Sequence, residues 1–348
     1  SSDVCSSDLK KSDIVLLDHG NGGQMSHDLT SEILLPLFDN PILSGLDDGA
    51  VFDIGKEHFA FSTDTYTVDP LFFPGGDIGD LAINGTVNDI SMCGAGPLYL
   101  SMGLIIEEGF SIADLKRILK SMSAAAKKAD IKVVTGDTKV VPKGAADRIF
   151  INTSGIGIIG KNVNVSIDNA SVGDKIILSG NIADHGITIL TQRKGMEFDT
   201  NLTSDTAPLN SMVKNMLASC GGEEHIHVLR DPTRGGVGTA LNEIAQKSNI
   251  GIRIYEDKIP IQRQAAGVCE LLGLDPVYLA NEGKLIAFVD EKYAWNVLSI
   301  IKKQEYGKNA CIIGEVVSED PGRVVMETHI GGTRIVDMLI GEQLPRIC

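Results

Sequence analysis

The sequence lacks any closely spaced pair of cysteines, although it contains six cysteines in all. They lie singly along the chain, and no two form a CxxC pair: Cys5, Cys93, Cys220, Cys269, Cys311 and Cys348. Structural zinc sites and small disulfide frameworks both need cysteines at short, repeated spacings. The pattern therefore excludes both and favours buried thiols in a reducing cytoplasm.

A second absence is that of long apolar segments. No run of about 18 apolar residues occurs, so no membrane span is expected. Residues 1–9 are polar and acidic and do not have the basic and apolar regions of a signal peptide. We expect residues 1–10 to be disordered or to derive from cloning, and the protein to be cytoplasmic.

The chain also lacks an excess of positive charge. It has 31 Lys and Arg against 46 Asp and Glu, a net charge of −15, and no basic cluster. This balance argues against nucleic acid or anionic membrane as a partner. A nucleotide ligand would need a divalent cation between its phosphates and the protein carboxylates. The 348 residues favour two domains.

Short β-branched runs separated by Gly and Asp predict a mixed α/β (α+β) fold. We expect strands at 59–64, 98–106, 131–135, 149–159, 173–180, 276–280, 284–289, 310–317 and 323–327. We expect helices at 78–91, 111–129, 182–192, 210–219, 237–248 and 292–303. Ser111 suits the N-cap of the second helix. The pattern relaxes at 161–172, which suggests a domain boundary.

Carboxylates recur where strands or helices are predicted to end. They are Asp47, Asp48, Asp64, Asp89, Asp137 and Asp231. Mg²⁺ prefers such oxygen ligands, and a few carboxylates with substrate phosphates suffice to bind it. Each Asp-Gly or Gly-Asp pair could instead simply form a turn. The adjacent pair Asp47-Asp48 is harder to explain in this way, because neighbouring carboxylates repel each other unless a cation or N–H groups offset their charge.

Three further positions are candidates for chemistry. Residues 18–25 form a Gly-rich segment whose N–H groups could bind phosphate, although it is neither a Walker A nor a Rossmann motif. Lys139 would share a face with Asp137 in an extended segment and could contact a phosphate or a reacting amide, or it could be a surface lysine. Glu282 lies at a predicted turn, as a base or as a plain turn residue.

The sequence ends on a cysteine, Cys348. Pro345 disfavours a helix in the tail, and eight extended residues span roughly 25 Å. Such a tail could carry its thiol into a distant active site and out again. The alternative is a frayed end without a function.

Together these motifs resemble the HypE hydrogenase-maturation family of the aminoimidazole-ribonucleotide-synthetase-like (PurM-like) ATP-binding superfamily. The resemblance runs in order from residue 18 to residue 348. The motifs are DHGNGG (18–23), LDDGA (46–50), NGTVNDI (84–90), GDTKVV (136–141), DPTRGGV (231–237) and PRIC (345–348). It implies an ATP-binding domain at 11–165 that forms a homodimer through its sheet, with ATP at the interface. It further implies a second domain at 166–340 and a mobile tail at 341–348.

The resemblance also implies a reaction at Cys348. A carbamoyltransferase, HypF, would place a carboxamide on the thiol, and ATP with Mg²⁺ would drive its dehydration to an S-cyanide. The cyanide would pass to iron on the HypC–HypD complex, for a [NiFe]-hydrogenase. The implied ligands of Mg²⁺ are Asp47, Asp48, Asp64, Asp89 and Asp137. The implied nucleotide contacts add Gly22, Gly23, Asn88, Gly136 and Thr138 to Asp48, Asp64, Asp89 and Asp137. Lys139 and Glu282 are both candidates for the base.

The thiol of a free cysteine has a pKa of about 8.5. The adjacent α-carboxylate should raise the pKa of Cys348, and Arg346 could offset this in part. We therefore expect the transferase to activate the thiol. Two other functions stay open: another superfamily enzyme, either a small-molecule kinase or a selenophosphate-synthetase-like enzyme, and a scaffold without chemistry. Selenophosphate synthetases place Cys or selenocysteine and Lys beside the Gly-rich loop, where this chain has His19 and Gln24.

Overall fold

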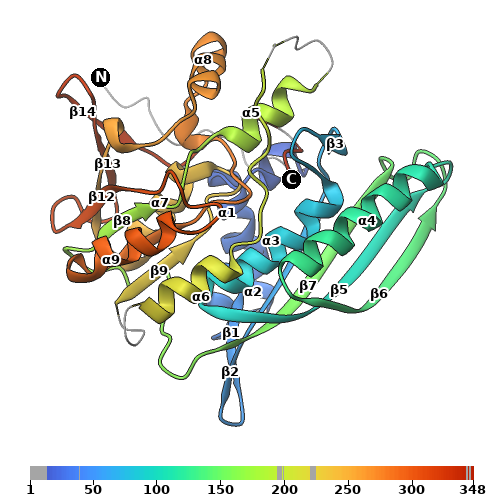
Figure 1. The fold of residues 1–348 in the computed structure, drawn as a ribbon, viewed down its shortest axis with the longest axis horizontal. Coiled ribbons are helices and arrows are strands. Elements are labelled where there is room, and N and C mark those ends of the chain that lie inside the picture. Colours follow the sequence, from blue (N-terminus) through green and yellow to red (C-terminus); the bar gives the residue numbers. More distant parts are fainter. Residues whose placement is uncertain are drawn as a thin grey trace.

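The computed structural model describes residues 14–38, 40–193, 198, 200–219, 225–341, 344 and 346–348. Two β-sheets with helices packed against them form the body of the molecule (Figure 1). The predicted mixed α/β class is therefore confirmed. Within the described residues, no helix has the length and apolar character needed to cross a membrane.

The first sheet has five strands. In spatial order they are β1 (Ala50–Ile54), β2 (Glu57–Tyr66), β7 (Ile149–Ile159), β5 (Ala95–Glu107) and β6 (Lys132–Val141). The pair β5–β6 is parallel and the other pairs are antiparallel. Two helices, α3 (Ile78–Met92) and α4 (Ile112–Lys128), lie along one face of the sheet (Figure 1).

Both helices begin at capped residues, of which the sequence predicts Ser111. Asp77 accepts hydrogen bonds from the N–H groups of Gly79 and Asp80, at 2.8 and 3.1 Å. The Ser111 hydroxyl accepts one from Asp114 N at 3.3 Å, and this confirms the predicted N-cap. Such caps satisfy amides that have no partner within the helix.

The second sheet has seven strands with helices on both faces. Its strands are, in spatial order, β14 (Thr333–Val336), β13 (Val324–Glu327), β10 (Gly251–Tyr255), β12 (Cys311–Val317), β8 (Lys175–Leu178), β11 (Ile286–Val289) and β9 (Ile226–Arg230). Helix α7 (Gly236–Ser248) packs in one apolar cluster, and α6 (Asn210–Ser219) with α9 (Glu291–Lys302) in another. Helices α5 (Asp184–Thr191) and α8 (Arg263–Leu272) share a third.

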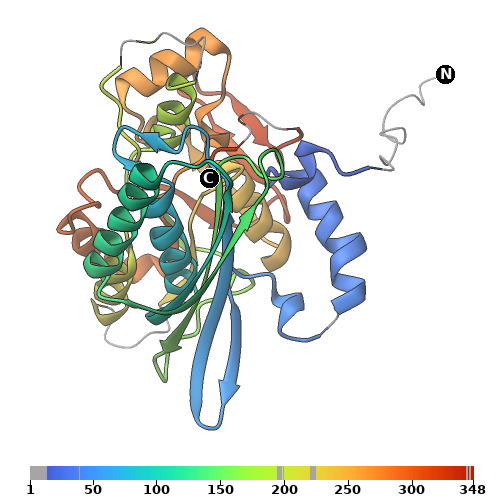
Figure 2. The same cartoon turned by 90° about the vertical axis from the view of Figure 1, so that its right-hand side faces the viewer.

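Short elements complete the chain. They are η1 (Leu17–Gly20), α1 (Gln24–Leu29), η2 (Thr30–Leu34), α2 (Leu35–Phe38), η3 (Leu43–Gly45), β3 (Phe72–Phe73), β4 (Gly76–Asp77), η4 (Glu256–Lys258) and η5 (Pro276–Tyr278). Figure 2 shows the N-terminal helices, in blue, standing to one side of the main body.

Three local predictions are wrong. The strand expected to end at residue 135 continues through Gly136, Asp137 and Lys139 to Val141, because β6 pairs with β5 along that whole length. The strand expected at 276–280 is a 3₁₀ helix, since Pro276 follows the N-cap Asp275, whose carboxylate accepts from Val277 N at 3.1 Å. Asp64 lies inside β2 and not at its end.

Candidate active site

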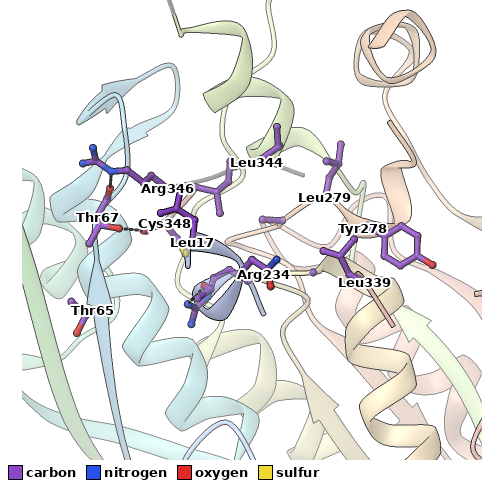
Figure 3. A pocket seen from close by; sticks show the side chains of 15 residues that line it. Leu17, Thr65, Thr67, Arg234, Tyr278, Leu279, Leu339, Leu344, Arg346 and Cys348 are labelled. Atoms are coloured by element: carbon purple, nitrogen blue, oxygen red, sulfur yellow. Dashed lines mark hydrogen bonds between the residues drawn. The ribbon is translucent and has the colours of Figure 1, made fainter. Parts of the chain in front are cut away.

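The tail is docked against the first domain, just beyond the end of β2. Thr67 N donates to the Cys348 carbonyl oxygen at 3.0 Å, and Asp69 N donates to the Arg346 carbonyl oxygen at 3.2 Å. The partner numbers fall as the donor numbers rise, which is the register of antiparallel strands. Figure 3 shows Arg346 and Cys348 next to Thr67, with dashed lines for the hydrogen bonds that join Thr67 to each of them.

Side chains from both domains hold the tail as well. The Arg346 guanidinium donates to Thr67 O at 2.9 Å through Nε and forms an ion pair with Asp147. His185 Nε2 lies 2.8 Å from Ile347 O, and Arg193 Nη2 donates to Arg346 O at 3.2 Å. The side chain of Ile347 is 5% exposed and belongs to the core of the first domain.

Cys348 lines a cavity of about 220 Å³ between the two domains. Thr65 and Thr67 line it from the first domain, and Arg234 and Leu279 from the second (Figure 3). Ligand pockets usually have about 300–1,000 Å³, so this cavity by itself is smaller than most ligand sites.

The electrostatic surroundings of Cys348 oppose a thiolate. Burial raises the pKa of the thiol above its usual range, and Glu282 and Asp64 raise it further, while Arg234 opposes them. The predicted high pKa is borne out, but its cause is burial, and the offsetting cation is Arg234. The Arg346 guanidinium is paired with Asp147 instead.

Four carboxylates interact with one another, and two of them, Asp64 and Asp89, also act on Cys348. The four are Asp48, Asp64, Asp89 and Asp231. Burial raises the pKa of Asp89, and Asp231, Asp64 and Asp48 raise it further. Burial raises the pKa of Asp231 to about 6. Arg230 pairs with Asp48 at 2.7 Å, and Asp48 Oδ2 is buried without a hydrogen-bond partner. This arrangement is short of positive charge, as the site of a divalent cation should be.

Two observations limit that interpretation. Across the described part of the chain, no three acidic, Cys or His side chains lie close enough together to hold a metal by themselves. Asp47 uses its carboxylate elsewhere, because it accepts from Ser166 Oγ at 3.0 Å and from Ile167 N at 2.9 Å. Asp47 thus joins the loop before β1 to the segment between the two sheets.

Glu282 lies beside the thiol, in a segment that Asn88 and Asp205 hold in place. Asn88 Nδ2 donates to Glu282 O at 3.2 Å and to Ala207 O at 3.0 Å, while its Oδ1 accepts from Leu209 N. Asp205 accepts from Glu282 N and pairs with Lys284, both at 3.0 Å. The side-chain amide of Asn88 therefore forms hydrogen bonds with backbone groups of the chain.

The surroundings of the Glu282 carboxyl group favour its protonated form. Glu282 is 4% exposed, and its Oε1 is buried without a hydrogen-bond partner. Burial raises its pKa well above the usual range, with Asp205 as the next cause. A carboxylate of this kind is a stronger base once ionised.

The Gly-rich loop uses its amides internally. Gly22 N donates to Ser26 Oγ at 3.0 Å, and Gly23 N donates to Asn21 Oδ1 at 2.8 Å. Gly22 has a φ of +78° and lies so close to Arg234 that a Cβ there would be 2.8 Å from Arg234 Cβ. Phosphate binding by Gly22 and Gly23 stays a prediction and would require both hydrogen bonds to exchange.

The GDTK segment lies elsewhere, on the edge strand β6. Asp137 pairs with Gly103, Gly103 with Asn152, and Asn152 with Thr65. These are three inter-strand steps, about 14 Å in all. Lys139 and Asp137 form an exposed ion pair at 2.7 Å. Within one chain, the structure does not bring Gly136, Asp137, Thr138 or Lys139 to Cys348.

Several residues of the site were not predicted. Asp231 is among the carboxylates that the sequence offers as Mg²⁺ ligands, but Arg234 lies in a quoted motif without an assigned role, and its charge alone could have signalled one. Thr67, His185 and Arg193 carry no sequence signal, since their importance depends on where the tail docks.

Both halves of the chain match known protein domains. The models for the N-terminal and C-terminal domains of AIR synthase related proteins match residues 46–159 and 171–327. The carbamoyl dehydratase HypE of Bradyrhizobium diazoefficiens is 48% identical over 332 residues, 95% of each chain. The chain belongs to the HypE family of AIR synthase related proteins. The predicted resemblance is confirmed.

Two solved structures are similar to the chain over most of its length. A HypE in complex with ATP is 51% identical, with a TM-score of 0.81 over 96% of this chain and 100% of that one. A HypE–HypF complex contains a chain that is 49% identical, with a TM-score of 0.85 over 89% of this chain and 99% of that one.

Proposed function

We propose that the protein is an ATP-dependent carbamoyl dehydratase that converts an S-carboxamide on Cys348 into an S-cyanide. The observation that carries the proposal is the docked tail, which holds the Cys348 thiol in a small cavity beside Glu282, Arg234 and the carboxylate cluster. The 48% identity to a carbamoyl dehydratase HypE supports it. A small-molecule kinase would not need its own tail in this cavity.

The chemistry balances as two steps. The carboxamide oxygen attacks the γ-phosphorus of ATP, so that ADP leaves, an O–P bond forms and the nitrogen loses one proton. The C–O bond then breaks, phosphate leaves, and the nitrogen loses its second proton to give the nitrile. Glu282 is a candidate acceptor of a proton because its buried carboxylate lies beside the thiol. Arg234 would neutralise charge that develops on the phosphate.

The carboxylate cluster fits Mg²⁺ as the companion of ATP. Asp48, Asp64 and Asp89, with Asp231, are the residues that would hold it, and Asp48 Oδ2 has no hydrogen-bond partner. Bound Mg²⁺ would neutralise phosphate charge. A role for Asp47 would require its hydrogen bonds to Ser166 and Ile167 to break.

We further propose that two copies of the chain complete the site. The outer face of the first sheet, opposite α3 and α4, exposes Phe61, Tyr99, Ile105 and Ile158, each by 40–48%. A homodimer through this face would bury these side chains. It could also bring Gly136, Asp137, Thr138 and Lys139 of one copy to the nucleotide of the other. Both the size of the cavity and the position of β6 favour this arrangement.

The remaining features of the proposal follow the family. We propose domains at 11–165 and 166–340, a carrier tail at 341–348, and a cytoplasmic location. HypF would load the thiol, as the solved HypE–HypF complex suggests, and HypC–HypD would receive the cyanide for a [NiFe]-hydrogenase.

One experiment tests the reaction. The purified protein is carbamoylated by its transferase, mixed with Mg–ATP, and the C-terminal peptide is weighed. We expect the loss of one water from Cys348, and none in a Cys348→Ser variant. Consumption of ATP with an unchanged peptide mass would refute the proposal. A small-molecule kinase would keep its activity in Cys348→Ser, and a scaffold would still bind its partners.

A further inference from the structure

We propose that Asp205 is a positioning residue for the dehydration, and that it acts by holding the backbone of Glu282, the candidate base. Lys284 is its counter-ion. Asp205 affects the reaction through Glu282 and not by contact with the reacting atoms. The inference rests on the proposed function for the reaction itself, whereas the contacts that carry it lie within the chain.

The two carboxylate oxygens of Asp205 have different partners. Oδ1 accepts from Glu282 N at 3.0 Å, and Oδ2 accepts from Lys284 Nζ at 3.0 Å. The side chains of Asp205 and Lys284 are only 3% and 10% exposed. Lys284 Nζ also donates to Gly283 O at 3.2 Å. Asp205 therefore binds the chain on both sides of Gly283, through hydrogen bonds that its charge strengthens.

The segment that carries Asp205 is fixed to the first domain by both of its neighbours. Ser204 N donates to Pro74 O at 2.8 Å. Asn84, on α3, donates from its Nδ2 to Thr206 Oγ1 at 3.2 Å. The candidate base lies in the second domain, so Asp205 connects it to the helix that carries part of the carboxylate cluster.

The backbone around Glu282 has little room to move. A Cβ at Gly283 would collide with Asp205 O and lie 2.9 Å from Ala207 N. The carbonyl of Glu282 accepts from Asn88 Nδ2 at 3.2 Å, while its N–H is bound by Asp205. Both backbone polar groups of Glu282 thus have side-chain partners, which fixes the point from which its own carboxyl group extends.

Asp205 is held in its ionised form. Burial acts to raise its pKa, but the charges of Lys284 and His185 and the hydrogen bond from Glu282 N outweigh burial, and the pKa is lowered. Loss of Lys284 alone would leave a buried carboxylate unpaired, which is strongly destabilising. A test of the hydrogen bond to Glu282 must therefore remove both charges together.

Two double variants isolate that hydrogen bond. Asp205→Asn with Lys284→Met, the amide pair, removes both charges but keeps an oxygen that can accept from Glu282 N. Asp205→Leu with Lys284→Met, the apolar pair, removes the acceptor as well at similar volume. Each chain is carbamoylated, and the rate of water loss from Cys348 is measured by peptide mass over a range of Mg–ATP concentrations.

We expect the maximal rate of the apolar pair to be about tenfold or more below that of the amide pair, because a misplaced base costs rate. The ATP concentration that gives half of the maximal rate should agree within about twofold, since Asp205 does not position the nucleotide. A general loss of structure would change both quantities. Asp205→Ala replaces Asp205→Leu if circular dichroism shows that the apolar pair does not fold.

Two further chains complete the test. Glu282→Gln should lower the maximal rate at least as far as the apolar pair does, because Asp205 acts only through Glu282. The matched control is Lys175→Met with Glu315→Gln, which removes a half-buried ion pair of 2.7 Å between β8 and β12. It should react at the rate of the parent chain.

The inference is overturned if the amide and apolar pairs have equal maximal rates, if they differ only in the half-saturating ATP concentration, or if Glu282→Gln reacts faster than the apolar pair. Hydrogen exchange of the peptide that contains Glu282 gives a readout without ATP or transferase, and its amide should exchange faster in the apolar pair. A parent chain that loses no water would refute the proposed function, and hydrogen exchange would still decide whether Asp205 holds Glu282.

Discussion

At the scale of single residues, the surroundings of the docked thiol oppose its ionisation. Burial is the first cause of the raised pKa of Cys348, and Glu282 is the second. A thiol must lose its proton to attack a carbamoyl donor. Loading therefore requires the tail to leave the cavity, where the thiol would regain an ordinary pKa.

We predict that iodoacetamide alkylates Cys348 of the parent chain more slowly than a free cysteine peptide at pH 7–8. A raised pKa lowers the thiolate fraction at these pH values, so the rate should rise only above the usual pKa of about 8.5. Peptide mass spectrometry across a pH series measures it. Arg346→Ala, which releases the tail, should restore ordinary rates. Half-maximal reactivity below pH 8 in the parent chain would contradict this prediction.

At the scale of elements, the candidate site residues on β6 lie apart from those around the tail. Asp137 and Lys139 lie on an edge strand, three inter-strand steps from β2. In this structure neither of them reaches the cleft of its own chain. A partner copy that packs on the outer face of the sheet could receive them.

We predict that Lys139→Ala and Cys348→Ser chains, each inactive alone, complement each other when they are mixed. In a mixed dimer, the Cys348 of one chain meets the Lys139 of the other. Equal mixing should restore cyanide formation on about half of the Cys348-bearing chains, as random pairing in a two-fold dimer gives. The mass of the C-terminal peptide reports it. Activity in Lys139→Ala alone would show that this lysine is dispensable, and no gain on mixing would place it within one chain.

The sequence predicts most of the helices and strands but fewer of the contacts between them. The periodicity of α3 and the Ser111 cap of α4 specify their own positions, because helix signals are local. The extension of β6 depends on pairing with β5, and the contact of Thr67 with Cys348 joins residues at opposite ends of the chain. Charge alone marks Asp48 and Asp89, whereas only the fold shows that Asp47 and Asn88 bond to the chain itself.

At the scale of the whole molecule, the two faces of the first sheet differ. Helices α3 and α4 cover one face (Figure 1), and the other exposes Phe61 by 42% and Tyr99 by 48%. Exposed apolar patches of this kind usually mark an interface.

We predict that Phe61→Glu converts the protein to a single chain of 37.1 kDa, as measured by size-exclusion chromatography with light scattering. A carboxylate buried in an apolar interface would be strongly unfavourable. Trp295→Glu is the matched control, since Trp295 on α9 is 72% exposed in the other domain. It should leave the mass of the parent unchanged. A Phe61→Glu variant of unchanged mass would exclude this face as the dimer interface.

The position of Thr67 on the chain has a mechanical consequence. Asp64 and Thr67 are three residues apart along one extended segment, roughly 10 Å. Asp64, which would hold Mg²⁺ and the phosphate, and Thr67, which binds the tail, therefore lie on the same extended segment. Their spacing does not depend on how the two domains open or close. In the proposed reaction the tail moves while this segment stays in place. The distance between Asp64 and the docked tail is therefore the same each time that the tail returns.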